Sequence, residues 1–588
     1  MDLLPSAHVD SFARDRLPAA DRWPELRFDL GGRGDLRYPE RLNCAAHLLD
    51  TAIAEFGPDR ACLIGESGKP AGADTGADSR ADTGAGTGAD PRVGTWTYGD
   101  LDRRSDQIAR VLTSELGVVP GNRVLLCGPN SPWTVACWFG VLKAGAVVVT
   151  VVPLLRSEEI ATVAGIAQAS VALCAPGCDQ EADKAGVAGM RVVTFGGNGP
   201  DDLVARCDRV GDRVGDGKFE AVQTSQDDVA MIAFTSGTTG RPKGCLHFHR
   251  DVLAIADTFA KHVLKAGPGD VFAGSPPLGF TFGLGGLVIF PLRVGAATVL
   301  LERGSPEALL GAIDKHGVSV LFTAPTAYRA MLTMLKPDAD GGDPHRDPRP
   351  DPRPDPRLRT LRRCVSAGEA MPAETWRAWR TATGIKIIDG IGATELLHIF
   401  ISAADDDIRP GSTGRPVPGW EAAILDADGH PVPDGEPGLL AVRGPVGCRY
   451  LADERQSTYV RDGWNYTGDT YIRDQDGYFW YQARSDDMII SSGYNIAGPE
   501  VENALLRHPS VLEAGVIGTP DPDRGQLVTA FVVLRPEAPT GEAAVKDLQE
   551  FVKARIAPYK YPRSVHIVDA LPRTNTGKLQ RFKLRDLL

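Results

Sequence analysis

The sequence predicts an α/β protein in two parts. A large N-terminal domain of doubly wound sheets with a small β unit is followed by a small, mobile α+β C-terminal domain. Helix and strand signals alternate through the first part, which is typical of parallel sheets with helices on both faces. Short strands with Pro and Gly turns then occupy residues 420–443, and mixed helix and strand signals follow Arg484.

The alternation in the N-terminal part is read from hydrophobic periodicity and from stop signals. Amphipathic spacing predicts helices, and short apolar runs bounded by turn residues predict strands. The predicted helices are residues 98–116, entered at 97–100, and residues 132–144, stopped by Gly145. The predicted strands are residues 123–127, 147–152 and 229–234.

The C-terminal part has a different pattern, which indicates a separate unit. We predict helices at 501–507 and 543–556, the second stopped by Pro558, and strands at 514–518 and 527–534. The last hundred or so residues are long enough for a small domain. We therefore expect an N-terminal domain at 1–484, a hinge at 485–487 and a C-terminal domain at 488–588.

Two segments have low complexity. Residues 71–91 consist largely of Gly, Ala, Asp and Thr, and residues 337–357 repeat Asp-Pro-Arg-Pro. Neither composition can bury apolar surface, so we predict two disordered surface insertions. A charged docking tail is the alternative for the second segment, although such runs are usually solvated spacers.

Composition narrows the class of protein. The chain has a formal net charge of −12 and 43% hydrophobic residues. Its length of 588 residues is too great for one compact domain. The negative charge, without a basic block, argues against nucleic-acid binding. The first thirty residues lack an apolar signal region, and the most apolar window, 146–155, is too short to span a membrane. We expect a soluble, cytoplasmic protein with no membrane partner.

The ten cysteines are scattered, and only Cys174 and Cys178 lie close together in the sequence. That spacing, without further Cys or His nearby, is a poor zinc signal. We expect most of them to be small, reduced core residues.

The chemistry is clearest after the apolar run at 229–234, where residues 235–244 read Thr-Ser-Gly-Thr-Thr-Gly-Arg-Pro-Lys-Gly. Glycines let backbone N–H groups approach an anion, hydroxyls add donors, and Lys243 adds a positive charge. A Walker loop requires Gly-Lys-Ser/Thr, whereas Lys243 here follows Pro242 and precedes Gly244. The loop therefore indicates phosphate binding outside the Walker class, with a flexible turn as the alternative.

This decapeptide resembles the phosphate loop of the adenylate-forming superfamily, which includes acyl-CoA synthetases, adenylation domains and beetle luciferases. The resemblance extends, in order, from Thr235 to Lys578 and covers nearly the whole chain apart from the two insertions. It implies ATP as a substrate. The residues that it assigns to the β- and γ-phosphates are Thr235, Ser236, Gly237, Thr238, Thr239, Gly240 and Lys243.

Two further motifs are expected to contribute to the nucleotide site. Residues 366–370 resemble the segment whose backbone lines the adenine pocket, which implicates Ala367, Gly368 and Glu369, although a plain strand-to-helix turn is the alternative. Residues 389–395 resemble the metal–phosphate motif, in which Thr394 would bind the α-phosphate and Glu395 would hold Mg²⁺. Ile391 replaces the usual aromatic residue of this motif. The ATP contacts implied here are Asp389, Gly390, Ile391, Gly392 and Thr394.

The resemblance continues past residue 460. Residues 466–469 match the ribose signature, and Asp469 could accept hydrogen bonds from both ribose hydroxyls. Arg484 is implied as a second ribose contact, although Ala483 replaces the family's usual glycine before it. Asp486 is the expected hinge residue. Gly493 matches the glycine that lines the pantetheine tunnel, where a side chain would narrow the passage.

The last motif, residues 572–578, matches the family's C-terminal lysine loop and makes Lys578 the expected catalytic lysine. A cation between a carboxylate and the α-phosphate lets two anions meet, and it neutralises charge that develops in an in-line displacement. Any single lysine near a terminus is usually just exposed, but the ordered motifs upstream favour the catalytic role.

Two segments indicate the acid. The Gly-rich stretch 274–285 and residues 395–400 resemble the benzoate-CoA ligase branch, and more particularly the 2-aminobenzoate-CoA ligases. A flat, partly apolar slot suits an aryl ring, and His398 could hydrogen-bond an ortho substituent or the carboxylate. The alternatives are a core histidine with a backbone partner and aromatics that only fill a core. The expected substrate contacts are Phe280, Thr281, Phe282, Gly283, Leu397, His398 and Ile399.

The resemblance thus implies an ATP-dependent aryl-CoA ligase that uses Mg²⁺ and coenzyme A and acts on benzoate or an ortho-substituted benzoate, with 2-aminobenzoate preferred and salicylate open. A stand-alone adenylation enzyme that loads a carrier protein in trans is the runner-up. A non-catalytic nucleotide-binding scaffold and a luciferase-like oxygenase are weaker alternatives, since fold analogy alone carries no function. A monomer and a homodimer both remain open.

Overall fold

The computed structural model describes residues 3–66, 94–197, 199–214, 217–235, 241–335, 355–484, 487–491, 494–521, 524–556, 558–573 and 579–588. The first predicted insertion, 71–91, lies outside the described residues, as do residues 337–354 of the second and residues 485–486 of the predicted hinge. Asp355 to Arg357 were predicted to end the second insertion, but they lie in the fold at the start of the short 3₁₀ helix η5 (Pro356–Leu358).

The phosphate-loop motif belongs to a six-stranded sheet with the order β6-β5-β3-β4-β7-β8. The first five strands are parallel, and only β8 runs antiparallel to its neighbour β7. Their bounds are β3 (Arg123–Cys127), β4 (Val147–Val151), β5 (Val171–Cys174), β6 (Arg191–Thr194), β7 (Val229–Thr235) and β8 (Lys243–Phe248).

A nine-stranded sheet with the order β15-β14-β13-β12-β11-β9-β10-β1-β2 carries the later motifs. Its central strands, from β13 to β1, are parallel. The bounds are β1 (Ala61–Glu66), β2 (Gly94–Thr97), β9 (Val271–Gly274), β10 (Ala297–Leu301), β11 (Val320–Thr323), β12 (Arg363–Ser366), β13 (Ile387–Gly392), β14 (Ile399–Ser402) and β15 (Arg415–Pro416).

The main core lies between these two sheets, because it joins apolar residues of β3 and β4 with those of β9, β11 and β13. Helix α4 is buried along its whole length, as a helix between two sheets must be. The N-terminal helices are α1 (Phe12–Asp15), α2 (Cys44–Phe56), α3 (Tyr98–Arg110), α4 (Pro132–Lys143), α5 (Ser157–Ala167), α6 (Cys178–Lys184), α7 (Leu203–Val214), α8 (His249–Ile255), α9 (Thr281–Leu284), α10 (Phe290–Arg293), α11 (Pro306–His316), α12 (Pro325–Leu332) and α13 (Ala373–Thr383).

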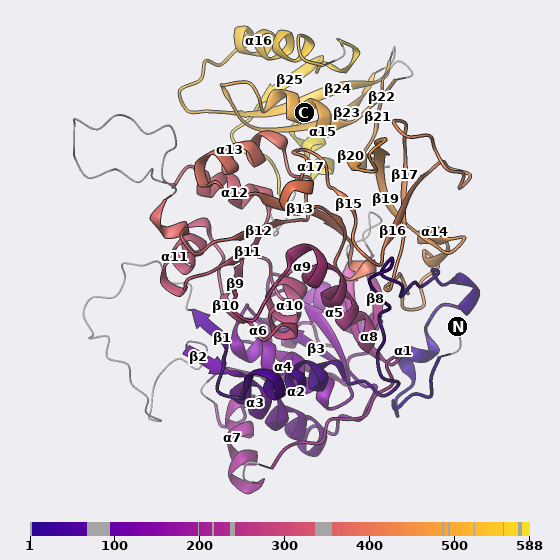
Figure 1. Ribbon diagram of the computed structural model, residues 1–588, viewed down its shortest axis with the longest axis vertical. Helices are drawn as coiled ribbons and strands as arrows, with labels where there is room; N and C mark the ends of the chain where they lie inside the picture. The colour runs from indigo at the N-terminus through magenta and orange to yellow at the C-terminus, as the bar shows by residue number, and fades with distance from the viewer. Residues whose placement is uncertain are drawn as a thin grey trace, which may run out of the picture.

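The predicted small β unit is present. It is a five-stranded antiparallel sheet that contains β16 (Glu421–Leu425), β17 (Pro437–Arg443), β18 (Val460–Arg461), β19 (Trp464–Arg473) and β20 (Phe479–Arg484), with the short helix α14 (Gln456–Tyr459) beside it. In Figure 1 this orange sheet lies beside the body of the N-terminal part. Its last strand ends at Arg484, just before the predicted hinge.

The C-terminal part is a separate α+β layer at one end of the molecule, above α12 and α13 in Figure 1. Its sheet contains β21 (Ile489–Ser491), β22 (Tyr494–Ile496), β23 (Val511–Asp521), β24 (Gly525–Leu534) and β25 (Ser564–Ile567). The helices are α15 (Gly498–Leu505), α16 (Glu542–Lys553) and α17 (Arg581–Leu584), and α15 and α16 pack on an apolar cluster of their own.

All ten cysteines are buried and unpaired, as the sequence predicted. Burial raises the pKa of thiols such as those of Cys44 and Cys207 well above the usual range, which keeps them protonated. Among the described residues, no helix has both the length and the apolar character needed to cross a bilayer.

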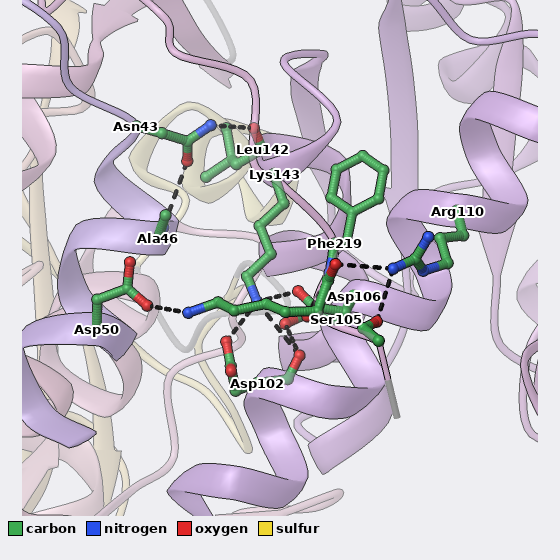
Figure 2. Close-up of polar contacts among 12 residues, drawn as sticks. Asn43, Ala46, Asp50, Asp102, Ser105, Asp106, Arg110, Leu142, Lys143 and Phe219 are labelled. Atoms are coloured by element: carbon green, nitrogen blue, oxygen red, sulfur yellow. Dashed lines mark hydrogen bonds and ion pairs between the residues drawn. The ribbon is translucent and has the colours of Figure 1, made fainter. Parts of the chain in front are cut away.

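A buried charge cluster holds the segment that precedes β7. Figure 2 shows Lys143, the last residue of α4, between two aspartates of α3. Its ammonium lies 2.6 Å from a carboxylate oxygen of Asp102 and 2.6 Å from one of Asp106. The other oxygen of Asp106 accepts a hydrogen bond from the backbone N–H of Phe219 at 3.0 Å. The cluster therefore ties α3, α4 and the segment before β7 together.

Backbone contacts extend the same attachment. The N–H of Val222 donates to the carbonyl of Lys143 at 2.9 Å, and the Asn43 amide donates to the carbonyls of Leu142 and Val222. Arg110, at the end of α3, donates to the carbonyls of Gly217 and Lys218 (Figure 2). The segment before β7, the strand that leads to the phosphate loop, is thus attached to α3 and α4.

Replacing Lys143 by Met should destabilise the N-terminal domain by about 3–5 kcal/mol, because two acidic groups would remain in a buried site without their cation. Urea unfolding followed by circular dichroism measures the change. Lys184→Met is the matched control. Because the Lys184 side chain is 63% exposed, its ion pair with Glu181 should contribute less than about 1 kcal/mol to the free energy of unfolding. Equal losses in the two variants would show that the cluster has no special weight.

Candidate active site

The predicted phosphate loop connects β7 to β8. Thr235 ends β7, Lys243 begins β8, and the two residues are partners in the antiparallel register. The predicted phosphate contacts Ser236, Gly237, Thr238, Thr239 and Gly240 lie outside the described residues. Lys243 itself is described, and its contacts place it at the centre of the site.

Lys243 and Glu395 meet around the hydroxyl of Tyr450. The Tyr450 hydroxyl lies 2.7 Å from the Lys243 ammonium and donates to Glu395 Oε1 at 2.6 Å. The ammonium and the same carboxylate oxygen are 3.5 Å apart. Burial, followed by the nearby Glu395 carboxylate, raises the pKa of Tyr450, so the phenol stays protonated and remains a donor. A predicted phosphate ligand and the predicted metal ligand therefore share one buried hydroxyl.

Tyr450 reaches this position because its segment pairs with β8. The N–H of Leu246 donates to the carbonyl of Arg449, and the N–H of Leu451 donates to that of Gly244. The N–H of Tyr450 donates to the side chain of Gln456 at 2.9 Å. Sequence reasoning did not select Tyr450, which lies 207 residues after Lys243, because no local pattern marks it.

His247 is a second residue that sequence reasoning missed. Its Nε2 lies 2.8 Å from the carbonyl oxygen of Thr394, so Nε2–H is the donor. Burial lowers the pKa of His247 to about 3, which keeps the imidazole neutral at physiological pH. Lys243 and His247 are four residues apart on one strand and share a face, so strand periodicity could have identified His247.

The other nucleotide motifs lie at the carboxyl ends of neighbouring strands. Ala367, Gly368 and Glu369 follow β12, while Asp389, Gly390, Ile391 and Gly392 end β13, and the two strands are paired in parallel. Thr394 and Glu395 lie in the next turn, η6 (Thr394–Leu396). Ligand sites of open α/β sheets occur at this edge. Burial raises the pKa of the Asp389 carboxyl well above its usual range.

The turn that carries Thr394 and Glu395 is compact because β13 and β14 form a hairpin. A Cβ on Gly392 would lie 2.8 Å from the carbonyl oxygen of His398, so a side chain there would force the strands apart. Leu397 adopts a positive φ of 67°, a conformation that is strained for a leucine and that reverses the chain before His398. Glu395 and His398 thus leave the same hairpin three residues apart.

The two predicted ribose residues face each other across the β unit. Asp469 on β19 is the register partner of Arg484 on β20, and Arg484 Nη1 lies 3.2 Å from Asp469 Oδ1. The same guanidinium donates to the carbonyl of Thr467 at 3.0 Å. Gly468 has a φ of +76°, which favours glycine, and a Cβ there would lie 2.7 Å from the Arg484 guanidinium, which would have to shift.

The predicted acid-binding residues come from the segment around α9 and from the end of the β13–β14 hairpin. Phe280 precedes α9, Thr281, Phe282 and Gly283 belong to it, and Ile399 begins β14. A π-helical turn, η4 (Gly285–Ile289), continues from α9, and turns of this kind often occur at functional sites. A Cβ on Gly285 would lie 2.3 Å from the His398 ring, so Gly285 makes room for the imidazole.

His398 is surrounded by aromatic rings. Its ring centroid is 4.5 Å from that of Phe290, 5.6 Å from that of Phe282 and 5.7 Å from that of Phe259. Neither ring nitrogen makes a hydrogen bond of standard geometry within the described part of the chain. Burial lowers the pKa of His398 to about 3, and the backbone of Phe282 opposes this shift more weakly. The imidazole is therefore neutral, with polar atoms that a ligand could satisfy.

The structure brings together Lys243 with Glu395, Asp469 with Arg484, and Phe282 with His398. Three further predicted residues, Lys578, Gly493 and the hinge residue Asp486, lie outside the described residues. Their roles remain predictions.

Comparisons with known proteins show the family of this chain. The family model described as AMP-binding enzyme matches residues 76–450, and the AMP-binding enzyme C-terminal domain matches residues 500–578. A benzoate–CoA ligase of Thauera aromatica is 35% identical over 565 residues, which cover 94% of this chain and 97% of that protein.

Solved structures extend the similarity to the whole fold. An anthranilate CoA ligase, in complex with anthranoyl-AMP, superposes with a TM-score of 0.80 at 32% identity, covering 94% of this chain and 98% of that one. A benzoate CoA ligase from Burkholderia xenovorans LB400 gives a TM-score of 0.76 at 32% identity, covering 92% of this chain and all of that one.

Replacing Tyr450 by Phe should lower the rate of adenylate formation by about 10- to 100-fold, because a hydrogen bond to a charged group is lost. Pyrophosphate release under saturating ATP measures the rate. Tyr459→Phe is the matched control: Tyr459 packs against Tyr450, and its buried hydroxyl has no hydrogen-bond partner among the described residues. A Tyr450→Phe enzyme as fast as the control would contradict the role assigned to this hydroxyl.

Proposed function

Because this chain belongs to the AMP-binding enzyme family, we propose that it is an ATP-dependent ligase that joins an aryl acid, 2-aminobenzoate or benzoate, to coenzyme A. The single observation that carries the choice of acid is the neutral His398 imidazole, which is buried among phenylalanine rings with neither nitrogen in a hydrogen bond of standard geometry among the described residues. Apolar rings suit a flat aromatic substrate, and a few polar groups in such a pocket fix its orientation.

In the first half-reaction, an oxygen of the acid's carboxylate attacks the α-phosphorus of ATP. The bond to the bridging oxygen breaks, pyrophosphate leaves, and an aryl-adenylate forms. Lys578 would offset the negative charges that meet at the α-phosphorus, while Thr394 and Lys243 would hold phosphate oxygens. Asp469 and Arg484 would hold the ribose, and residues 367–369 and 389–392 would line the adenine pocket.

Glu395 fits the role of a magnesium ligand, because Mg²⁺ in nucleotide sites uses few carboxylates together with phosphate oxygens. Tyr450 orients one of its carboxylate oxygens, at 2.6 Å, and leaves the other outside that hydrogen bond. When bound, the ion would neutralise part of the phosphate charge.

In the second half-reaction, the thiol of coenzyme A attacks the carbonyl carbon of the adenylate and AMP leaves. We propose that the C-terminal domain, residues 488–588, turns about Asp486 between the two steps, so that the Gly493 face replaces Lys578 at the site. The protein supplies positioning and charge, and no protein nucleophile is needed.

His398 would discriminate between acids through its neutral ring. A neutral imidazole can accept a hydrogen bond from an ortho amino group or donate one to an ortho hydroxyl. With a pKa of about 3, it would not change its charge between pH 6 and pH 8. The preference for a given ortho substituent should therefore be independent of pH over that range.

The deciding experiment measures pyrophosphate release across aryl and fatty acids, with and without coenzyme A. The proposal expects aryl-dependent release and formation of an aryl thioester when coenzyme A is present. Aryl-adenylate formation that ignores coenzyme A would favour transfer to a carrier protein instead. No release with any aryl acid would refute the proposal.

Replacing His398 by Leu should lower kcat/KM for 2-aminobenzoate by about tenfold more than kcat/KM for benzoate, because one hydrogen bond to the ortho group is lost. The ratio of the two specificity constants is the measurement. Phe282→Leu serves as the control, since a smaller apolar side chain should weaken both acids alike. An unchanged ratio in the His398 variant would show that the ring does not contact the ortho position.

A further inference from the structure

Glu369 connects the two parts of the molecule. It lies three residues after Ser366, the last residue of β12, in the segment predicted to line the adenine pocket, and its side chain reaches the C-terminal domain. Glu369 Oε1 accepts a hydrogen bond from the backbone N–H of Leu579 at 3.1 Å. The same oxygen lies 3.7 Å from the guanidinium of Arg573. One carboxylate thus contacts both residues that flank segment 574–578.

Neighbouring charges hold Arg573 in place. Its other guanidinium nitrogen lies 2.7 Å from Glu513 of β23, within the C-terminal domain. From the N-terminal side, Arg329 of α12 donates to the carbonyl of Leu512 at 3.5 Å. The side chains of Arg573 and Glu369 are only 25% and 23% exposed, so water screens their attraction only in part.

The residues that make these contacts belong to, or lie beside, two predicted functional motifs in the sequence. Leu579 directly follows Lys578, the predicted catalytic lysine, and Arg573 is the second residue of the same motif, residues 572–578. Glu369 directly follows Gly368 of the predicted adenine segment. The contacts therefore join the nucleotide-binding side of one domain to the lysine motif of the other.

We propose that the Glu369 side chain is a positioning residue for adenylate formation: it holds the C-terminal domain in the orientation that serves the first half-reaction. This inference rests on the proposed function, because it assumes that Lys578 acts in that step. The two contacts must break when the domain turns for thioester formation. Glu369 therefore assists one half-reaction and is not needed in the other.

The test measures the half-reactions separately in full-length enzyme. Adenylate formation is followed as ATP–pyrophosphate exchange with the acid, and thioester formation is followed from supplied aryl-adenylate and coenzyme A. Glu369→Ala removes both contacts and should lower the exchange rate at saturating ATP by about 10- to 100-fold. Glu369→Gln keeps an acceptor for the Leu579 N–H but loses the charge, so it should recover part of that loss.

In Glu369→Ala the ratio of the exchange rate to the rate of thioester formation from supplied adenylate should fall about tenfold below that of wild type, since the positioned orientation is used only in the first half-reaction. Damage to the adenine pocket would weaken both half-reactions, because both bind the adenosine moiety. Glu374→Gln is the matched control: Glu374 of α13 lies 3.4 Å from Arg507 across the same pair of domains, but away from the lysine motif. It should leave the exchange rate unchanged.

The outcomes separate this inference from the proposed function. Wild-type enzyme that catalyses neither half-reaction would refute the function itself. Active wild type with normal exchange in Glu369→Ala, or with equal losses in both half-reactions, would refute the positioning role. An equal loss of exchange in Glu374→Gln would show that any ion pair between the domains has the same effect, which also overturns the assignment to Glu369.

Discussion

The site depends on one buried hydroxyl that holds two opposite charges together. Lys243, Glu395 and Tyr450 come from β8, from the turn after β13 and from a segment 207 residues beyond Lys243, and the phenol of Tyr450 touches both charged groups. A buried lysine or glutamate alone would be costly, whereas the pair is compensated by a hydroxyl that accepts from the lysine and donates to the glutamate. The six-stranded sheet, the nine-stranded sheet and the chain before β18 are therefore brought to one point.

Much of the fold could be predicted, because local patterns decide it. The capping box that starts α3 at Thr97, the fully buried strand β3 and the Gly145 stop after α4 all lie where the sequence indicated. The boundaries were less secure. The first C-terminal helix begins at Gly498, before the predicted residue 501, because Pro499 is tolerated in the first turn of a helix. Asp355 caps η5, so the end of a low-complexity repeat belongs to the fold.

Site residues could be predicted where a motif consists of consecutive residues. They could not be predicted where residues distant in the sequence come together. The motifs around Lys243, Thr394 and Asp469 are short strings of consecutive residues, which the structure places at β8, in the turn after β13 and on β19. Tyr450 and two of the rings around His398, those of Phe259 and Phe290, come from separate elements, so only three-dimensional structure identifies them. The β13–β14 hairpin also joins the predicted metal ligand to the acid pocket, which couples changes in one to the other.

The burial of every cysteine has a practical consequence for studies of motion in this protein. Because all ten thiols are buried, a maleimide dye would find no accessible native target in the folded chain. One surface cysteine introduced on α16 and another on α11 would then carry a donor and an acceptor fluorophore without any prior removal of native cysteines. Single-molecule energy transfer between them would test, in real time, whether the C-terminal layer rotates as we propose.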